Sequence, residues 1–298
     1  MIDLEFYSPV QQLTDPLFVE KEIEVYIKRD DLIHPFISGN KWRKLKYILR
    51  KAQIEKKNHL VTFGGAYSNH LLATACAAAK FGFKSTGVVR GEPVENDVLM
   101  FCQLFGMQLQ FISRENYRDK VLYFTDAFKN DLNAYFIDEG GASPEAVQGS
   151  AELIDELQDN YNHIFCASGT GTTVAGLIKG IKHKKLDSTI HSVPVLKNGS
   201  FLKQDISKYL NAEDEFQIHL DYHFGGYAKT EPELLNFIKK FASAHGILLD
   251  PVYTGKLFFA IYDLINKDFF KKNEKILAVH TGGLFGILGM SEKFRQLI

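Results

Sequence analysis

Residues 164–179 read Ile-Phe-Cys-Ala-Ser-Gly-Thr-Gly-Thr-Thr-Val-Ala-Gly-Leu-Ile-Lys, an apolar run, then glycines and hydroxyls, then a helix-period segment. This order predicts a buried strand, a turn and a helix. Open parallel sheets bind ligands where strands end and helices begin. Glycines let backbone N–H groups converge there, and the helix N-terminus adds partial positive charge. We therefore predict a phosphate-binding turn at residues 168–173, with a glycine-rich turn that binds nothing as the alternative.

The turn matches neither of the two common nucleotide motifs. Val174 stands where a dinucleotide-binding motif has its third glycine, and Leu177 stands where a P-loop has its lysine. A phosphate held without that lysine indicates a cofactor monophosphate more than a transferable nucleotide phosphate. A phosphate-binding protein without catalytic activity remains an alternative.

Apolar β-rich runs alternate with helical segments over most of the chain, which predicts an α/β protein with parallel sheets covered by helices. Neither an internal repeat nor a low-complexity linker interrupts the pattern, so any second domain is joined by short crossings. The expected strands are residues 25–28, 59–63, 86–89, 108–112, 135–137, 164–166, 190–195, 216–220 and 276–279.

Capping residues predict where helices begin and end. Asn40 is expected to cap one helix. Ser68 is expected to cap an alanine-rich helix that ends at Gly82. Pro93 is expected to open another helix, which ends at Gly106.

The composition indicates a cytoplasmic enzyme. The 298 residues allow one or two domains, and 35 basic against 36 acidic side chains provide no excess positive field for nucleic acid or a membrane surface. No apolar run approaches the ~20 residues of a membrane span, and the first residues do not resemble a signal peptide. Cys76, Cys102 and Cys166 have no metal- or redox-type spacing, so we expect reduced core cysteines and no metal site.

Lys41 is the first candidate catalytic residue. It follows Asn40 at a helix start, where a lysine opposes the helix dipole and gains no stability. Such local inconsistency is typical of functional positions, and a desolvated lysine is a nucleophile that forms Schiff bases. The alternative is that Lys41 belongs, with Arg43, Lys44 and Lys46, to a solvated basic face.

Ser68, Asn69 and His70 open the alanine-rich helix three residues after the pair Gly64-Gly65. Free N–H groups at a helix start favour an anion such as a substrate carboxylate. The alternatives are that Ser68 is only an N-cap and that His70 is a hydrogen-bonded helix residue. The surroundings of Ser68 do not match the GxSxG elbow of serine hydrolases.

Five motifs in order, spanning nearly the whole chain, resemble the group of pyridoxal-phosphate enzymes that contains 1-aminocyclopropane-1-carboxylate (ACC) deaminase and D-cysteine desulfhydrase. Two departures concern single positions: Ser38 replaces a usual glycine, and Leu71-Leu72 stand where an arginine is common. The chain is also shorter than typical members. The motifs are Lys28-Arg-Asp-Asp31 with Ser38-Gly-Asn-Lys-Trp-Arg-Lys-Leu45, Gly64-Gly-Ala-Tyr-Ser-Asn-His70, Ala167–Thr173, Asp250-Pro-Val-Tyr-Thr-Gly-Lys256 and His280-Thr-Gly-Gly283.

The resemblance implies the fold of the tryptophan synthase β-subunit, a two-domain α/β architecture with open twisted parallel sheets (fold type II). Residues 1–47 and 136–298 would form the large cofactor-binding domain, and residues 48–135 a small inserted α/β domain. Pyridoxal 5′-phosphate would lie between the domains of a homodimer.

The resemblance also implies residue roles. Lys41 would form the Schiff base with the cofactor, with Lys28 and Lys44 as the alternatives. A neutral threonine is expected at the ring nitrogen, because no Asp or Glu stands in residues 253–256 or 280–283. The remaining roles are the phenolic oxygen for Asn69, the phosphate for Gly169, Thr170, Gly171, Thr172 and Thr173, the ring nitrogen for Thr254 or Thr281, and the substrate for Ser68, Asn69, His70, Tyr253 and Tyr227.

Two positions bear on the substrate. ACC deaminases typically have Gln and Glu where this chain has His70 and Thr254, the pattern of the desulfhydrase branch. A neutral partner gives a weaker electron sink, which suffices for a thiol leaving group. We therefore expect D-cysteine to yield pyruvate, ammonia and sulfide. Deamination of ACC to 2-oxobutyrate and ammonia is the alternative, and a β-replacement synthase, which would need a second substrate, is a third possibility.

Overall fold

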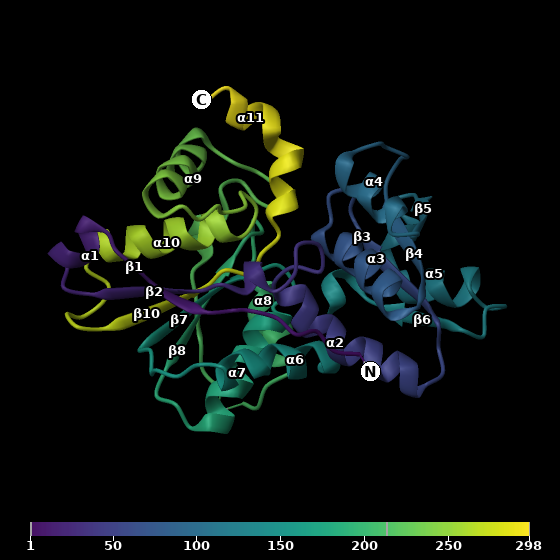
Figure 1. Ribbon diagram of the computed structural model, residues 1–298, viewed down its shortest axis with the longest axis horizontal. Helices are drawn as coiled ribbons and strands as arrows, with labels where there is room; N and C mark the ends of the chain where they lie inside the picture. Colours follow the sequence, from purple (N-terminus) through teal and green to yellow (C-terminus); the bar gives the residue numbers. More distant parts are fainter. Residues whose placement is uncertain (1, 213, 298) are drawn as a thin grey trace.

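The computed structural model describes residues 2–212 and 214–297, which form two sheets with helices packed on them (Figure 1). β1 runs antiparallel to β2, and the other described ladders are parallel. The predicted α/β class with parallel sheets and two domains is confirmed. The larger sheet has the order β1 (Val10–Leu13), β2 (Glu24–Lys28), β10 (Lys275–Val279), β7 (His163–Ser168), β8 (Thr189–Pro194), β9 (Gln217–Ile218), and the smaller has the order β5 (Gln108–Ile112), β4 (Lys84–Arg90), β3 (His59–Gly64), β6 (Ala134–Ile137).

Both faces of the larger sheet are covered, because alternate residues of its strands point to opposite sides. On one face, Phe165 packs with the apolar residues of α9 and α10. On the other face, Ile164 and Cys166 pack with those of α6, α7 and α8. The helices are α1 (Pro16–Glu20), α2 (Asn40–Ile54), α3 (Asn69–Phe81), α4 (Asp97–Leu104), α5 (Lys120–Ala127), α6 (Pro144–Asp155), α7 (Thr172–Lys184), α8 (Phe201–Ser207), α9 (Pro232–His245), α10 (Thr254–Asn266) and α11 (Ser291–Arg295).

Each expected strand has a counterpart, with two differences. The strand expected at 216–220 shortens to β9, because a 3₁₀ turn begins at Leu220. β1 was not predicted, since its sequence Val-Gln-Gln-Leu is short and mostly polar. It forms an edge strand that gains its order from pairing with β2.

The predicted helix starts are partly wrong. Ser68 caps α3 and the left-handed Gly82 ends it, as expected. By contrast, α2 begins at Asn40 itself, after Gly39. Asn96 and not Pro93 caps α4, because the Asn96 side chain accepts a hydrogen bond from the Leu99 amide.

The smaller sheet packs against α2 and α3 on one side. The predicted boundaries after residues 47 and 135 fall inside α2 and inside β6. We therefore propose that the inserted domain comprises the elements from β3 to β6, residues 59–137. The three cysteines are free and buried. Among the described residues, no helix has both the length and the apolar composition that a membrane crossing needs.

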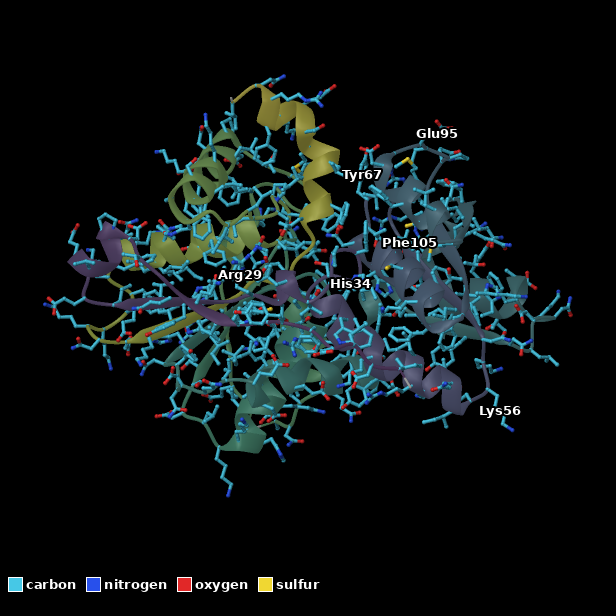
Figure 2. All side chains as sticks on the ribbon, viewed as in Figure 1. Arg29, His34, Lys56, Tyr67, Glu95 and Phe105 are labelled. Carbon is cyan, nitrogen blue, oxygen red and sulfur yellow. The ribbon has the colours of Figure 1, made fainter. Side chains whose placement is uncertain are left out.

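Aromatic contacts join the two domains beside the loop that precedes α2. Figure 2 labels His34 in this loop and Phe105 next to α4. His34 Nδ1 accepts hydrogen bonds from the amides of Phe36 and Ile37, which fixes the turn. The Phe36 ring then contacts Phe105 at the end of α4 and Phe285 after β10, with centroids 5.0 and 5.3 Å away. This contact brings the loop ends of the two sheets to one place.

Candidate active site

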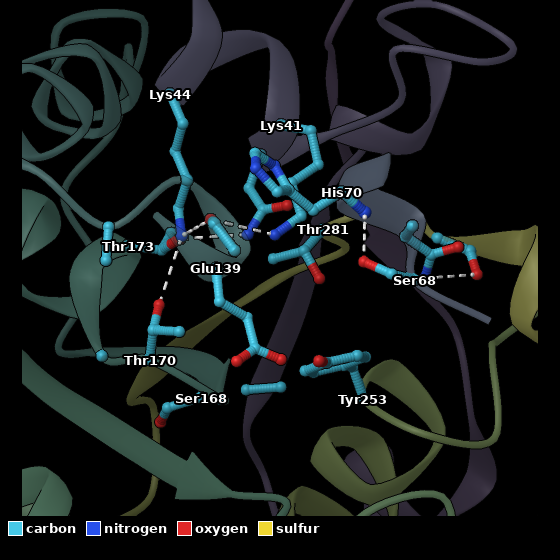
Figure 3. A pocket seen from close by; sticks show the side chains of 18 of the residues that line it. Lys41, Lys44, Ser68, His70, Glu139, Ser168, Thr170, Thr173, Tyr253 and Thr281 are labelled. Atoms are coloured by element: carbon cyan, nitrogen blue, oxygen red, sulfur yellow. Dashed lines mark hydrogen bonds between the residues drawn. The ribbon is translucent and has the colours of Figure 1, made fainter. Parts of the chain in front are cut away.

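A cavity of about 710 Å³ lies between the domains, lined by loops at the carboxyl ends of β3, β6, β7 and β10 (Figure 3). This is where an open parallel sheet is expected to bind a ligand. The glycine- and hydroxyl-rich loops that the sequence singled out meet here. Predicted site residues among the lining are Lys41, Ser68, Asn69, His70, Gly169, Thr170, Gly171, Thr173, Tyr227, Tyr253 and Thr281.

The turn before α7 forms one end of the cavity. Gly171 has a φ of +74°. A Cβ there would lie 2.4 Å from Ile206 Cγ1, so both conformation and space demand glycine. The first backbone hydrogen bond of α7 runs from Ala175 N–H to the Gly171 carbonyl, at 3.0 Å. The N–H groups before Ala175 have no helical acceptor and are available to an anion.

The threonines of this turn do not act alike. Thr170 and Thr173 line the cavity, and the Thr173 hydroxyl accepts a hydrogen bond from Asn40 Nδ2 at 3.0 Å. Thr172 is fully buried and not among the lining residues, and its hydroxyl lies 3.1 Å from that of Thr170. Asn40 was predicted to cap α2, but Gly39 takes the cap position and the Asn40 side chain hydrogen-bonds to the turn instead.

Lys41 lies in the first turn of α2 and points into the cavity (Figure 3). Its Nζ donates to the Gly140 carbonyl at 3.3 Å. Burial lowers the pKa of Lys41 to about 8, against the opposing effect of the Glu139 carboxylate. About a tenth of the amine is therefore uncharged at pH 7, and the uncharged form is the one that a nucleophilic amine requires.

Lys44, one turn along the same face of α2, was considered only as an alternative Schiff-base lysine and was not predicted to lie beside the phosphate turn. Its Nζ lies 3.0 Å from the Gly140 carbonyl and 3.5 Å from the Thr170 hydroxyl. Burial and the positive charge of Lys41 lower its pKa well below the usual value. The sequence signal for this position was its spacing of three residues from Lys41, because residues three apart lie on the same face of a helix. The solvated basic face is thus wrong for Lys44, which is 2% exposed.

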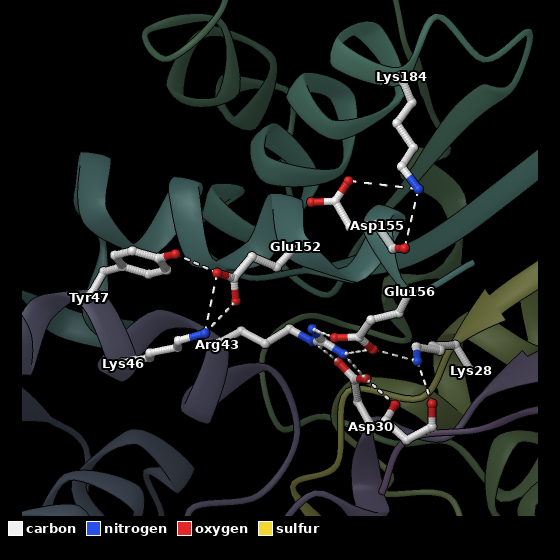
Figure 4. A network of polar contacts seen from close by, with 10 residues as sticks. Lys28, Asp30, Arg43, Lys46, Tyr47, Glu152, Asp155, Glu156 and Lys184 are labelled. Carbon is white, nitrogen blue, oxygen red and sulfur yellow. Dashed lines mark hydrogen bonds and ion pairs between the residues drawn. The ribbon is translucent and has the colours of Figure 1, made fainter. Parts of the chain in front are cut away.

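Arg43 points away from the cavity into a buried ion network (Figure 4). Its guanidinium donates to both carboxylate oxygens of Asp30 at 2.7 Å and to Glu156 at 2.7 and 2.9 Å. Lys28 Nζ also pairs with Glu156, at 2.7 Å. Burial alone would raise the pKa of Asp30, but Arg43 lowers it below its usual value. The network joins α2 to β2 and α6, and Lys28 is not among the lining residues of the cavity.

The start of α3 forms the wall opposite the phosphate turn. Ser68 Oγ accepts the amides of His70 and Leu71 at 3.2 and 3.3 Å, so it is an N-cap that also lines the cavity. Asn69 Nδ2 donates to the Gly283 carbonyl at 3.3 Å. In return, Ser38, the departure from the motif, accepts the Gly283 amide at 3.2 Å. The three loops are therefore tied to one another.

His70 is buried, and the geometry determines its tautomer. Thr62 Oγ1 donates to the Ile137 carbonyl at 3.1 Å, so it must accept from His70 Nε2 at 2.8 Å. The lone pair then lies on Nδ1, which finds no partner among the described residues. Burial, with the charges of Lys41 and Lys44, lowers the pKa of His70 well below its usual value. A neutral acceptor thus lines the cavity.

Tyr253 and Tyr227 face each other across the substrate side, with ring centroids 6.1 Å apart. Burial and the neighbouring Tyr227 raise the pKa of Tyr253 well above its usual value, so Tyr253 stays protonated. Both tyrosines line the cavity.

The two threonines considered for the ring nitrogen differ in position. Thr281 lines the cavity. The Thr254 hydroxyl donates to Asp250 at 2.7 Å and accepts the Asp250 amide at 2.8 Å, and Thr254 is fully buried outside the lining. The geometry therefore does not support Thr254 as a cofactor ligand, because its hydroxyl is committed to the start of α10.

The cavity lining also contains charged residues that were not predicted: Arg90, Lys120, Asp138, Glu139, Asp205 and Lys208. Glu139 follows β6. Arg90 is the last residue of β4, and its Nη2 lies next to Gly65, 3.8 Å from the position that a Cβ on that glycine would take. Neither position carries a recognisable local motif, since each reaches the cavity only through the arrangement of the smaller sheet.

These features fit pyridoxal phosphate. The turn before α7 offers unpaired N–H groups and hydroxyls for a phosphate, with Lys44 beside it. Lys41 is a buried amine with a lowered pKa, and the cavity between it and Tyr253 has room for a ring and an amino acid.

Comparison with known proteins agrees with this fit. The family model described as pyridoxal-phosphate dependent enzyme matches residues 4–282. A crystal structure of an ACC deaminase homologue superposes with a TM-score of 0.86 at 30% identity, covering 100% of this chain and 95% of that one. The chain therefore belongs to the family of pyridoxal-phosphate-dependent enzymes, and the predicted cofactor is confirmed.

Two relatives bear on the branch of the family. A Pyrococcus furiosus protein, assigned provisionally as a 1-aminocyclopropane-1-carboxylate deaminase, is 32% identical over 98% of this chain and 94% of its own length. A mitochondrial Arabidopsis thaliana protein, named as a bifunctional D-cysteine desulfhydrase and ACC deaminase, is 30% identical over 92% of this chain and 76% of its own length. The predicted resemblance to this group is confirmed, and the relatives carry both activities in their names.

Proposed function

We propose that the protein is a pyridoxal-phosphate-dependent lyase that converts D-cysteine, or a related β-substituted small D-amino acid, into pyruvate, ammonia and the leaving group. The observation that supports this substrate is that two loops of the cavity present uncharged hydrogen-bonding side chains. Thr281 lines the cavity after β10, and the neutral His70 lines it at the start of α3. The only nearby carboxylate in residues 250–256 is Asp250, which is buried against Thr254.

The bound cofactor supplies an electron sink for the Cα of the amino acid. Lys41 holds the cofactor and moves the Cα proton, because a pKa of about 8 suits an amine for both roles near neutral pH. The Asn69 N–H at the start of α3 binds the substrate carboxylate, because the amides of His70 and Leu71 already donate to Ser68 Oγ. The protonated phenol of Tyr253 faces the leaving group and can give it a proton.

The turn from Gly169 to Thr173 would hold the phosphate of the cofactor. Lys44 adds a positive charge there, since its Nζ already approaches the Thr170 hydroxyl. Asn40 holds the Thr173 hydroxyl as an acceptor, which leaves its proton free for the phosphate.

The substrate is tested by incubating the cofactor-loaded enzyme separately with D-cysteine, L-cysteine and ACC, and measuring sulfide and 2-oxo acid. We expect sulfide and pyruvate from D-cysteine and little or no 2-oxobutyrate from ACC. A Lys41→Ala variant provides the blank. Efficient 2-oxobutyrate release without sulfide from D-cysteine would favour the second candidate, ACC deaminase, which the names of the relatives support.

We further propose a homodimer in the cytoplasm. The family resemblance supports the dimer, and the buried free cysteines suit a reducing compartment. Light scattering after size-exclusion chromatography measures the oligomeric state, and a mass of one chain would contradict the dimer.

A further inference from the structure

Lys256 is a buried cation in the first turn of α10, where a lysine opposes the helix dipole. Its Nζ donates to three backbone carbonyls: His223 and Gly226 at 2.8 Å, and Val195 at 3.4 Å. It forms no ion pair with any of the described residues. The closest acidic influence is Asp250, whose oxygens accept three backbone amides and a hydroxyl. The three donors of the ammonium are thus matched by three carbonyl oxygens.

The three carbonyls belong to the segments that build the substrate side of the cavity. Val195 follows β8 and donates its own amide to the Ser168 carbonyl at 3.0 Å, directly before the phosphate turn. His223 and Gly226 lie in the turn that presents Tyr227. Lys256 itself stands three residues after Tyr253. One ammonium therefore connects the turn carrying Tyr227, the start of α10 and the end of β8.

The turn that presents Tyr227 has an unfavourable backbone. Four of its residues have positive φ: Phe224 at 49°, Gly225 at 84°, Gly226 at 119° and Ala228 at 54°. Phe224 and Ala228 are not glycines, so their conformations are costly and persist only where surrounding contacts impose them. The hydrogen bonds from Lys256 to the carbonyls on either side of Phe224 and Gly225 are such contacts.

We infer that the Lys256 ammonium acts as a built-in monovalent cation, which holds the Tyr227 turn against α10 and so positions Tyr227 opposite Tyr253. A cluster of inward-facing carbonyl oxygens without a carboxylate is also the environment that K⁺ or NH₄⁺ prefers. Removal of the side chain should therefore leave a site that either ion can fill. Lys256 is a positioning residue, because it is not among the residues that line the cavity and acts through the turn that carries Tyr227.

The test compares Lys256→Ala, which leaves room for an ion, with Lys256→Met, which fills the same space without charge. Each variant is assayed in potassium, ammonium and choline chloride at equal ionic strength. In choline, kcat on D-cysteine should fall about 10- to 100-fold in both variants, with a smaller change in KM, because misplacement of a cavity group lowers the rate. Potassium or ammonium should restore Lys256→Ala several-fold and leave Lys256→Met unchanged.

The unfolding temperature is the second measurement, and it does not depend on activity. Potassium or ammonium should raise it in Lys256→Ala relative to choline, because an ion that binds only the folded state stabilises it. The matched control is Lys28→Met, which removes another buried lysine whose partner is the Glu156 carboxylate. Neither this control nor the unmodified enzyme should distinguish potassium from choline.

Wild-type kcat in both Lys256 variants, or an equal loss in both that no cation reverses, would overturn the inference. If Lys256→Ala folds only when potassium or ammonium is present, the inference is supported, and failure to fold in all three salts would contradict it. The inference uses the proposed function only for the activity assay. If the unmodified enzyme acts on neither D-cysteine nor ACC, the proposed function fails, while the cation dependence of the unfolding temperature still decides the role of Lys256.

Discussion

Arg43 and Lys44 are neighbours on α2, and both are 2% exposed, yet they lie in opposite environments. Arg43 meets two carboxylates, Asp30 and Glu156, with every hydrogen bond between 2.7 and 2.9 Å. Lys44 meets only a carbonyl and a hydroxyl, and it shares its surroundings with the cation Lys41. The first region binds the helix to the rest of the protein, and the second keeps two lysines that form no ion pair with the described residues, with Glu139 as the carboxylate that acts on Lys41.

The difference distinguishes structural charge from functional charge. Buried charges are ordinarily paired, as Arg43 is. Buried cations that face a cavity with lowered pKa values indicate a site prepared for an anion or for chemistry. Lys256 belongs to a third kind, in which carbonyl oxygens alone satisfy the ammonium.

The largest effect should come from Lys41→Ala, with a loss of about 10³- to 10⁴-fold in kcat, because the proton-transfer group and the link to the cofactor are both removed. Borohydride reduction of the loaded enzyme followed by peptide mapping should place the label on Lys41. Lys46→Ala, on the same helix, is the control with normal activity. A label on Lys44 or Lys28 would show that Lys41 is not the lysine that binds the cofactor.

Arg43→Met should chiefly affect stability. It leaves the buried Asp30 carboxylate without its guanidinium, which costs about 3–5 kcal/mol in the free energy of unfolding. Urea denaturation measures this loss. Asp30→Asn combined with Arg43→Met should recover part of it, because no uncompensated charge remains. An unchanged unfolding free energy in Arg43→Met would show that the network does not stabilise the fold.

Lys44→Met should leave the fold intact and weaken the binding of pyridoxal phosphate by about 1.5–3 kcal/mol, the range for a hydrogen bond to a charged group. Absorbance titration of the apoenzyme measures the affinity. Lys46→Met is the matched control, since Lys46 pairs with Glu152 on the outer side of α2. Equal affinity in Lys44→Met and the control would remove Lys44 from the phosphate site.

The pH dependence of cofactor uptake should report the state of Lys41. Burial lowers the pKa of Lys41 to about 8. The neutral amine therefore predominates above this pH, and its fraction decreases as the pH falls below it. The rate at which the apoenzyme takes up pyridoxal phosphate should therefore rise with pH and level off above about 8, changing about tenfold per pH unit well below it. A rate independent of pH between 6 and 9, in stopped-flow absorbance, would contradict the lowered pKa.

The smallest effect separates two threonines of one turn. Thr173→Ala should weaken cofactor binding by about 0.5–2 kcal/mol, because its hydroxyl lines the cavity and can donate to the phosphate. Thr172→Ala should change the affinity less, since that hydroxyl is buried beside Thr170. Equal losses in the two variants would mean that Thr172 also reaches the phosphate.

Much of the fold was predictable because strand and helix patterns are local. The apolar runs predicted the parallel strands, and Ser68 and Gly82 marked the ends of α3 correctly. β1 was not predicted, because a short and mostly polar edge strand has no alternating pattern of apolar residues. The prediction that Asn40 caps α2 was wrong, because an asparagine side chain can also hydrogen-bond to a residue distant in the sequence, here Thr173.

The sequence by itself determined the class of site. The glycines before α7 imply an anion-binding turn, because that property depends on backbone freedom and on a helix end. The lysine at the start of α2 marks a candidate amine, but its pKa is lowered by burial, which only the folded protein provides. Tertiary structure decided which side chains share the cavity. Each helical residue turns its side chain about 100° from the last, so Arg43 and Lys44 diverge into an ion network and a cavity. The three carbonyls that Lys256 contacts belong to Val195, His223 and Gly226, which are 61, 33 and 30 residues away in the chain, and only the folded protein brings them together.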